Sequence, residues 1–453
     1  MVSGRMKLDK TPPPLPLPFA GCSDRLAQRI RTGEYGVAKM ESRQARQSVS
    51  GRPLSHLILS GRWRFGFALA STEIFLIAAA IRWWFFDVTE FRGDELVYLS
   101  FAKRLSTAGL TQFRTLAETY ASDPSLWVYP PPLRAVYLLL AAVACRVAGD
   151  CSGTAVAAIS LLSGLALVLL TLVMARRMFG EWVGLLSGLL VALSPLQLAM
   201  SRRVWADAFF SLTLLLAIWA FWERTRSPRK GWDLLLGCSL LAAILTKESA
   251  VVFYLGLLCA LLFREQSPAA PIARSTLAAL LLPPVLAFLT LLVLVPDPAL
   301  LIRLYSGTYS ATKTGEYAMS YSQGPWFRYL IDFALLSPLT TILAIGYYFT
   351  QSGKDSPFLG RCALILFMLF SLVALKNVRY VGFLDILIRI LAVLSLTSLS
   401  HRPPFARLGE RWLLLPVLLL AAYDLFAFYR IFIGGGVYDP VTATLARAER
   451  LIP

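Results

Sequence analysis

The sequence has little of what nucleotide-dependent and hydrolytic enzymes commonly use. Of 453 residues only two are histidines, His56 and His401, and both stand near predicted cytosolic ends of apolar runs. Two histidines are too few to make a histidine-based metal site or a Ser-His triad a plausible expectation. No Gly-rich phosphate loop stands on the predicted cytosolic side either, which argues against a nucleotide site there. We expect no organic cofactor.

Charge is also scarce, since 16% of the residues are charged and 57% are hydrophobic, with a mean hydropathy of +0.62. A soluble domain of this size cannot bury that much apolar surface, so the expected solvent is a lipid bilayer. The net charge of +17 raises nucleic acid as a partner. The cations stand at the edges of apolar runs, however, and that distribution indicates membrane topology and no nucleic acid.

The six cysteines form no disulfide framework. Cys238, Cys259 and Cys362 lie inside apolar runs, where a lone cysteine is usually a small packing residue. Cys145 and Cys151 pair if their face of the membrane is oxidising, but the pattern favours unpaired packing residues.

The first 60 residues differ from the rest, because 11–18 is proline-rich and 25–52 is basic and polar. No apolar region precedes a cleavage site, so this is not a signal peptide. We expect 1–60 to be a disordered basic cytosolic tail, or the product of a mis-assigned start codon. Residues 61–453 then form a single transmembrane domain, including a first outer loop at 87–153.

Apolar runs of about 20 residues predict an all-α polytopic membrane protein with about 11 transmembrane helices. The expected spans are 64–86, 154–175, 182–200, 206–222, 232–246, 249–263, 276–296, 329–350, 361–375, 381–399 and 411–431. The run 133–148 is ambiguous, because it is short, follows three prolines and carries Arg134 and Arg146.

Orientation resolves that ambiguity. With a cytosolic N-terminus and 133–148 lying on the membrane, the basic clusters at 176–177, 224–230, 264–274, 354–361 and 402–411 all face the cytosol. If 133–148 spans, the first two clusters move outside. We therefore expect interfacial, amphipathic helices in the first outer loop and a plasma- or inner-membrane protein.

Acidic residues follow the first span almost immediately. Tyr98, Phe101, Ala102 and Leu105 repeat at helical spacing, so an amphipathic helix is expected to start near Asp94 and to lie along the surface. Asp94 either caps this helix or acts as a carboxylate at the water–lipid boundary, where it can meet a soluble acceptor and a lipid carrier.

A second acid, Asp207, either pairs with a neighbouring arginine or belongs to a site. Several cations fall on the outer side, next to span ends: Arg202, Arg203, Lys247, Lys376 and Arg379. Such side chains either snorkel and pair locally, or together bind an anion such as a lipid phosphate. Tyr305, Tyr309, Tyr317, Tyr321 and Trp326 in the loop 297–327 suit an aromatic belt or a sugar-binding pocket.

In their order along the chain, these segments resemble superfamily C (GT-C) glycosyltransferases, in particular the protein mannosyltransferase and aminoarabinose transferase branch. Four pieces carry the resemblance: Gly93–Tyr98 with Ala102, Leu105 and Gly109; Tyr129–Leu133; Ser201-Arg202 with Asp207; and Thr246-Lys247 with Lys376–Tyr380. Relatives often have a His, Glu or Lys beside the proline motif, where Tyr129 and Pro130 stand here. A bound metal is therefore open, and a divalent cation is one option.

The resemblance implies transfer of a hexose or pentose from a polyprenyl-phosphate donor to a glycan, lipid or protein acceptor of the cell envelope, with inversion. Asp94 is the expected base, and Glu95 and Asp207 are supporting acids. Lys247, Lys376, Arg379, Tyr380 and Arg202 are expected near the lipid phosphate, and Tyr98, Tyr129, Tyr309 and Trp326 in the pocket. The alternatives are a transporter or flippase for an anionic lipid or solute, since Glu73, Arg82, Asp332, Asp385, Arg389 and Asp424 lie in or near spans, or a non-catalytic membrane subunit.

Overall fold

The computed structural model describes residues 54–86, 93–227, 229–262, 273–314, 322–350, 357–403, 405–436 and 444. The chain divides into two units, 1–65 and 66–453, and the second contains nearly all of the described residues. Most of the expected tail, 1–53, lies outside them, as do Tyr317 and Tyr321.

The regular secondary structure of the described residues is helical, apart from one isolated bridge between Gln323 and Leu375. The α-helices are α3 (Leu54–Trp84), α4 (Asp94–Ala108), α5 (Gln112–Ser122), α6 (Ala135–Ala148), α7 (Gly153–Phe179), α8 (Glu181–Ala192), α9 (Pro195–Ser201), α10 (Asp207–Arg226), α11 (Lys230–Ile244), α12 (Ala250–Leu262), α13 (Arg274–Leu294), α14 (Pro298–Thr314), α16 (Arg328–Leu336), α17 (Pro338–Thr350), α18 (Pro357–Leu372), α19 (Gly382–Ser400) and α20 (Leu414–Phe428). Short helical turns are η1 (Pro124–Val128), η2 (Val378–Val381), η3 (Phe405–Leu408), η4 (Glu410–Leu413) and the π-helical η5 (Tyr429–Ile433).

Apart from α4, α5 and α14, the α-helices coincide with the apolar runs, and they confirm an all-α, multi-pass membrane protein. Five described helical stretches are long and apolar enough to cross a membrane: Gly66–Trp84, Gly153–Phe179, Arg274–Leu294, Val378–Ser400 and Glu410–Ile433. The bent pair α8 and α9 also meets that criterion when it is taken as one broken span. The other expected spans coincide with shorter or more polar helices, so the number of about 11 spans stays a prediction.

Two expected spans are broken at a Ser-Pro step. The run 182–200 divides into α8 and α9, which are bent by 58°. The hydroxyl of Ser194 accepts a hydrogen bond from the Gln197 backbone N–H, so Ser194 caps α9, and Pro195 occupies its first turn. The run 329–350 divides in the same way into α16 and α17, at Ser337 and Pro338.

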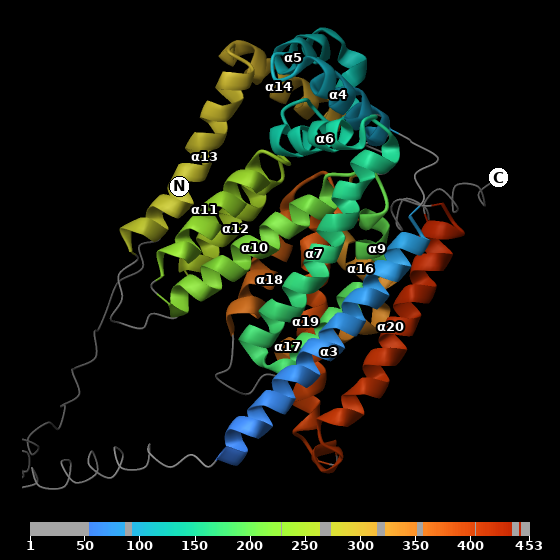
Figure 1. The fold of residues 1–453 in the computed structure, drawn as a ribbon. Coiled ribbons are helices and arrows are strands. Elements are labelled where there is room, and N and C mark those ends of the chain that lie inside the picture. The colour runs from blue at the N-terminus through green and yellow to red at the C-terminus, as the bar shows by residue number, and fades with distance from the viewer. Residues whose placement is uncertain are drawn as a thin grey trace, which may run out of the picture. The chain divides into compact units, whose positions relative to one another are not determined.

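Helices α4, α5, α6 and α14 gather at one end of the bundle (Figure 1). As expected, α4 begins at Asp94 and buries Tyr98, Phe101, Ala102 and Leu105. Helix α6 packs against α4 and α7 and lies across this end without threading through the bundle. Its 14 residues are too few to cross a bilayer, in line with the expected surface helix.

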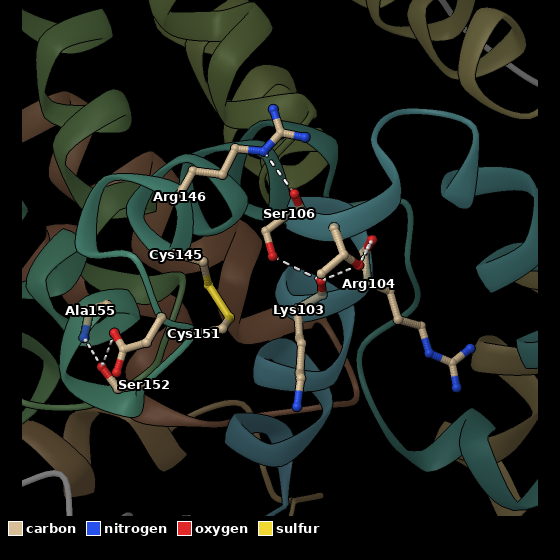
Figure 2. The surroundings of a disulfide bond; sticks show 10 residues. Lys103, Arg104, Ser106, Cys145, Arg146, Cys151, Ser152 and Ala155 are labelled. Atoms are coloured by element: carbon tan, nitrogen blue, oxygen red, sulfur yellow. Dashed lines mark hydrogen bonds between the residues drawn. A yellow bond between two sulfur atoms is a disulfide. The ribbon is translucent and has the colours of Figure 1, made fainter.

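The Cys145–Cys151 pair corrects the sequence-based interpretation, which favoured unpaired cysteines. A disulfide joins the end of α6 to the residues before α7 (Figure 2). Beside it, Arg146 Nε donates to the Ser106 carbonyl at 2.8 Å, and the Ser152 hydroxyl caps α7 by accepting from the Ala155 N–H at 3.3 Å. The joint between the outer helices and α7 is thus fixed covalently and by hydrogen bonds.

Candidate active site

Asp94 stands at the first position of α4, and the preceding glycine shapes the turn that presents it. Gly93 has φ 54°, a backbone conformation that side-chain-bearing residues rarely adopt. Gly93, and not Asp94, occupies the capping position, so the alternative in which Asp94 merely caps the helix is not what the structure has. The Asp94 side chain is 33% exposed, and its Oδ2 lies 3.6 Å from Arg379 Nη2.

Arg379 connects Asp94 to the second acid. Its Nη1 lies 3.8 Å from Asp207 Oδ2, and its guanidinium stacks 4.4 Å from the centroid of the Trp205 ring. Asp207 also forms a buried ion pair with Lys247. Residues from α4, α10, η2 and the α11–α12 connection therefore meet in one charge cluster, Asp94–Arg379–Asp207–Lys247.

Lys247 is the most enclosed cation of this cluster. Its side chain is 5% exposed, and its ammonium lies 4.1 Å from the centroid of the Tyr380 ring. Burial lowers the pKa of Lys247 to about 8, and the Asp207 carboxylate opposes that shift. Two cations and two carboxylates, one of them open to water, thus form a compact polar site.

Glu95 lies next to Asp94 in the chain, but its carboxylate faces the protein interior. It is fully buried, forms a paired contact with Arg203 at 2.5 and 2.8 Å, and accepts from the Val204 backbone N–H at 3.1 Å. This contact ties α4 to the segment before Asp207. The protein itself thus holds the Glu95 carboxylate, and its expected role as a supporting acid stays a prediction.

Arg134 is a residue of the site that the sequence did not single out. Its guanidinium forms two hydrogen bonds to the carboxylate of Glu248, at 3.1 and 2.7 Å, and a third to the Tyr98 hydroxyl. Burial acts to raise the pKa of Glu248, but Arg134 outweighs it and the pKa is lowered. Tyr98 is one turn after Asp94, and Glu248 is next to Lys247, so Arg134 links two arms of the charge cluster. The sequence feature that could have identified Arg134 is its position directly after the proline motif, Tyr129–Leu133.

The remaining expected residues lie around the cluster or apart from it. Lys376 Nζ donates to the carbonyls of Gly324 and Val373, at 3.0 and 2.7 Å, and so fastens the segment before α16 to the segment before η2. Arg202 Nε donates to the Phe85 carbonyl at 2.8 Å, at the end of α3. The Tyr129 carbonyl accepts from the Tyr120 hydroxyl at 2.8 Å.

Tyr309 and Trp326 are more than half exposed, with described ring contacts to Lys313 and Phe327 respectively. These contacts do not link either ring to the charge cluster, and the pocket role of both residues stays a prediction.

The donor set does not favour a metal ion. Among the described residues, no group of three or more His, Cys, Asp or Glu side chains is placed to hold one. Asp94 and Asp207 instead flank the same guanidinium, which neutralises the carboxylates that a divalent cation would need. The site is suited to proton transfer by a carboxylate beside a bound anion.

Comparison with known proteins shows similarity both in part of the sequence and in the fold. A family model described as dolichyl-phosphate-mannose-protein mannosyltransferase matches residues 131–294. No curated protein matches the sequence. Among solved structures, ArnT from Cupriavidus metallidurans bound to undecaprenyl phosphate is similar, with a TM-score of 0.52 and 15% identity, over 86% of this chain and 77% of that one.

The Archaeoglobus fulgidus oligosaccharyltransferase is also similar. Its apo form gives a TM-score of 0.53 at 13% identity, over 83% of this chain and 56% of that one. The form tethered to an acceptor peptide gives 0.52 at 12% identity, over 83% and 55%. This chain thus spans little more than half of that enzyme, and 60% of ArnT in its apo state.

These similarities establish the fold, and the family model supports it over the segment that includes α6, Asp207 and Lys247. By fold, and over residues 131–294 by this match, the chain resembles the GT-C superfamily of glycosyltransferases.

Proposed function

We propose that the chain transfers a sugar from a polyprenyl-phosphate carrier to an acceptor on the non-cytosolic face of the membrane, with inversion at the anomeric carbon. The observation that carries the proposal is the charge cluster, in which a partly exposed carboxylate, Asp94, stands within 4 Å of a cation, Arg379, that also reaches Asp207. A base next to an anion-binding group is what this reaction requires.

In the proposed reaction, Asp94 accepts the proton of the acceptor hydroxyl. The resulting oxygen nucleophile forms a bond to the anomeric carbon from the face opposite the phosphate. The bond between that carbon and the phosphate oxygen breaks, and its electron pair leaves with the polyprenyl phosphate. The proton on Asp94 then passes to water, which is accessible because the side chain is 33% exposed.

Arg379 and Lys247 would stabilise the charge that develops on the departing phosphate. A phosphate leaves without a general acid, unlike the alkoxide in glycoside hydrolysis. Preorganised cations in a poorly solvated site act strongly on such charge, and each contributes up to ~3 kcal/mol. Asp207 holds both cations in place, because it contacts Lys247 and Arg379 at once.

The relatives support a lipid-linked donor. The similar ArnT structure contains undecaprenyl phosphate, and a similar oligosaccharyltransferase structure carries an acceptor peptide. The side of the membrane is supported by the Cys145–Cys151 disulfide at the end of the molecule that holds α4–α6, since disulfides persist in oxidising compartments.

The charged residues within the spans give little support to a transporter. Asp385, Arg389 and Asp424 pair with one another, with Arg389 Nε 3.1 Å from Asp385 and Nη1 on Asp424. Charges neutralised in this way suit a structural network better than a substrate path through the bilayer. Formation of a covalent product in proteoliposomes separates the two functions.

The direct test is Asp94→Asn, assayed with purified protein and lipid-linked sugar donors. The amide preserves size but cannot accept the proton, so we expect the transfer rate to fall by roughly 10²–10⁴-fold. Donor binding should be retained, because the phosphate-side cations are unchanged.

The matched control is Glu118→Gln, which neutralises an exposed carboxylate of the same outer loop, paired only at the surface with Arg114 among its described contacts. It should leave the rate unchanged. Near wild-type transfer by a correctly inserted Asp94→Asn protein would remove the base assignment.

A further inference from the structure

We propose that Gln197, together with Ser194 and Asp385, is a positioning device that sets where Arg379 lies relative to Asp207; the inference rests on the proposed function. These residues lie at the break between α8 and α9 and at the start of α19, and we call them the α9–α19 clamp. None of them is expected to touch donor or acceptor, because each is at least 97% buried.

Gln197 provides the link between the two helices. Its amide nitrogen donates to the Gly382 carbonyl at 2.8 Å and to Asp385 Oδ2 at 3.2 Å. Gly382 follows η2 directly, and η2 contains Arg379. One buried amide therefore holds the carbonyl three residues after the site arginine.

Ser194 and Asp385 close the clamp from the other side. The Ser194 hydroxyl donates to Asp385 Oδ2 at 2.7 Å while it caps α9. Asp385 is held in turn by Arg389 Nε, at 3.2 and 3.1 Å from its two oxygens. Hydrogen bonds thus tie the break between α8 and α9 to the first turn of α19.

Close packing at Gly382 adds a second constraint. A Cβ at this position would lie 2.6 Å from Met200 Cε and 2.9 Å from Ser211 Oγ, closer than real Cβ atoms approach. Met200 belongs to α9, and Ser211 is one turn after Asp207 in α10. Three helices therefore converge on one glycine, and they carry the two sides of the Arg379–Asp207 contact.

The clamp thus explains how the contact between Arg379 and Asp207, which are far apart in the sequence, is maintained. Arg379 is attached to Gly382 by η2, and Asp207 is attached to Ser211 by the first turn of α10. If the Gln197 amide is lost, the start of α19 is released from α9, and the 3.8 Å Arg379–Asp207 approach loosens.

Two measurements test the clamp. In Gln197→Met, hydrogen exchange of the backbone amides at 378–382 should accelerate by roughly tenfold, because local opening there becomes easier. Thr213→Val is the matched control. Thr213, in α10, is buried like Gln197, but its hydroxyl donates only to the Phe210 carbonyl among its described bonds. It should leave exchange at 378–382 unchanged. Ser194→Ala, which loses the two hydrogen bonds of the Ser194 hydroxyl to Asp385 and Gln197, replaces Gln197→Met if that protein does not fold.

The second measurement is kinetic. Gln197→Met should lower kcat by roughly tenfold and change the donor KM by less than about twofold, because the donor phosphate already carries one negative charge and the second develops only in the transition state. If Gln197 acts through Arg379, this loss should shrink to less than about twofold in an Arg379→Lys background. A purely structural role would give additive losses.

The outcomes separate the clamp from the proposed function. Unchanged exchange at 378–382 in Gln197→Met and Ser194→Ala overturns the clamp, even if the wild-type protein transfers sugar. Faster exchange in a protein that transfers no sugar from any polyprenyl-phosphate donor leaves the clamp standing and removes the proposed function. Additive kinetic losses overturn the positioning role.

Discussion

At the scale of single residues, the candidate site balances its charges almost pairwise. Asp207 faces Lys247 and Arg379, Asp94 faces Arg379, and Glu248 faces Arg134. Buried charges are tolerated when they are paired and hydrogen-bonded, so such a site can form before any substrate arrives. A substrate phosphate then enters a preorganised field, and the protein need not reorganise around it.

Lys247 makes the site sensitive to pH. Its pKa is lowered from 10.5 to about 8, so the ammonium is charged below that pH and neutral above it. If its charge stabilises the leaving phosphate, kcat/KM for the donor, which reports the groups of the free enzyme, should decrease as the pH rises through about 8. In Lys247→Arg the charge persists, and the decrease should move upward by at least ~2 pH units.

The measurement is the pH profile of kcat/KM for the lipid-linked donor. Lys103→Arg is the control, because Lys103 is an exposed lysine of α4. A Lys247→Arg profile that coincides with that of the wild type would exclude Lys247 as the group that titrates.

The Arg134–Glu248 pair should contribute to stability as well as to site geometry. The two side chains are 14% and 32% exposed, so the pair is only partly desolvated. Replacing either partner leaves a poorly solvated charge behind, and Arg134→Gln or Glu248→Gln should cost ~1–3 kcal/mol. The double variant should cost less than the sum of the two. Thermal unfolding in detergent measures this, and strict additivity would mean that the pair contributes no coupling energy.

At the scale of elements, the apolar runs predicted the helices well but not their interruptions. Length and hydropathy located α3, α7, α13, α19 and α20, since an apolar run in a bilayer has little alternative to a helix. The breaks at Ser194 and Ser337 were missed, although a serine followed by a proline signals a new helix start. In the prediction of the spans, the length of the apolar run was given more weight than the Ser-Pro step.

The candidate site shows a comparable limit. The sequence order predicted that Asp94, Asp207, Lys247 and Arg379 belong together, and the structure brings them into one cluster. The sequence did not predict that Arg203 pairs with Glu95 or that Arg134 pairs with Glu248. Nor did it predict that Lys376 donates to backbone carbonyls. Charge type limits which residues pair, but the choice among several arginines depends on tertiary distances, which no local pattern contains.

The Cys145–Cys151 disulfide should stabilise the joint between α6 and α7. In the chain-entropy description, closing so short a loop contributes about 2 kcal/mol. We expect Cys145→Ser/Cys151→Ser to unfold at a lower temperature and to become insensitive to reductant, whereas the wild-type melting temperature falls when reductant is added. Cys238→Ser, which removes an exposed free cysteine, is the control. A wild-type protein whose cysteines alkylate fully without reduction would contradict the disulfide.

At the scale of the whole unit, residues 66–453, the charge distribution predicts which end faces the cytosol. The α10–α11 connection is basic, with Arg226, Arg229 and Lys230, and so is the α19–α20 connection, with Arg402, Arg407 and Arg411. Figure 1 shows the α19–α20 connection at the end opposite α4–α6. Positive connections remain on the cytosolic side during insertion, so the charge cluster should face outward.

Single cysteines introduced into a protein in which Cys22, Cys238, Cys259 and Cys362 are replaced by serine test this orientation. Thr119→Cys places an exposed thiol in α5, and Arg229→Cys places one between α10 and α11. In intact cells, a membrane-impermeant maleimide should label the first and spare the second until the membrane is opened. The reverse pattern would put Asp94 on the cytosolic side, where nucleotide sugars are available, and would remove the main reason for a lipid-linked donor.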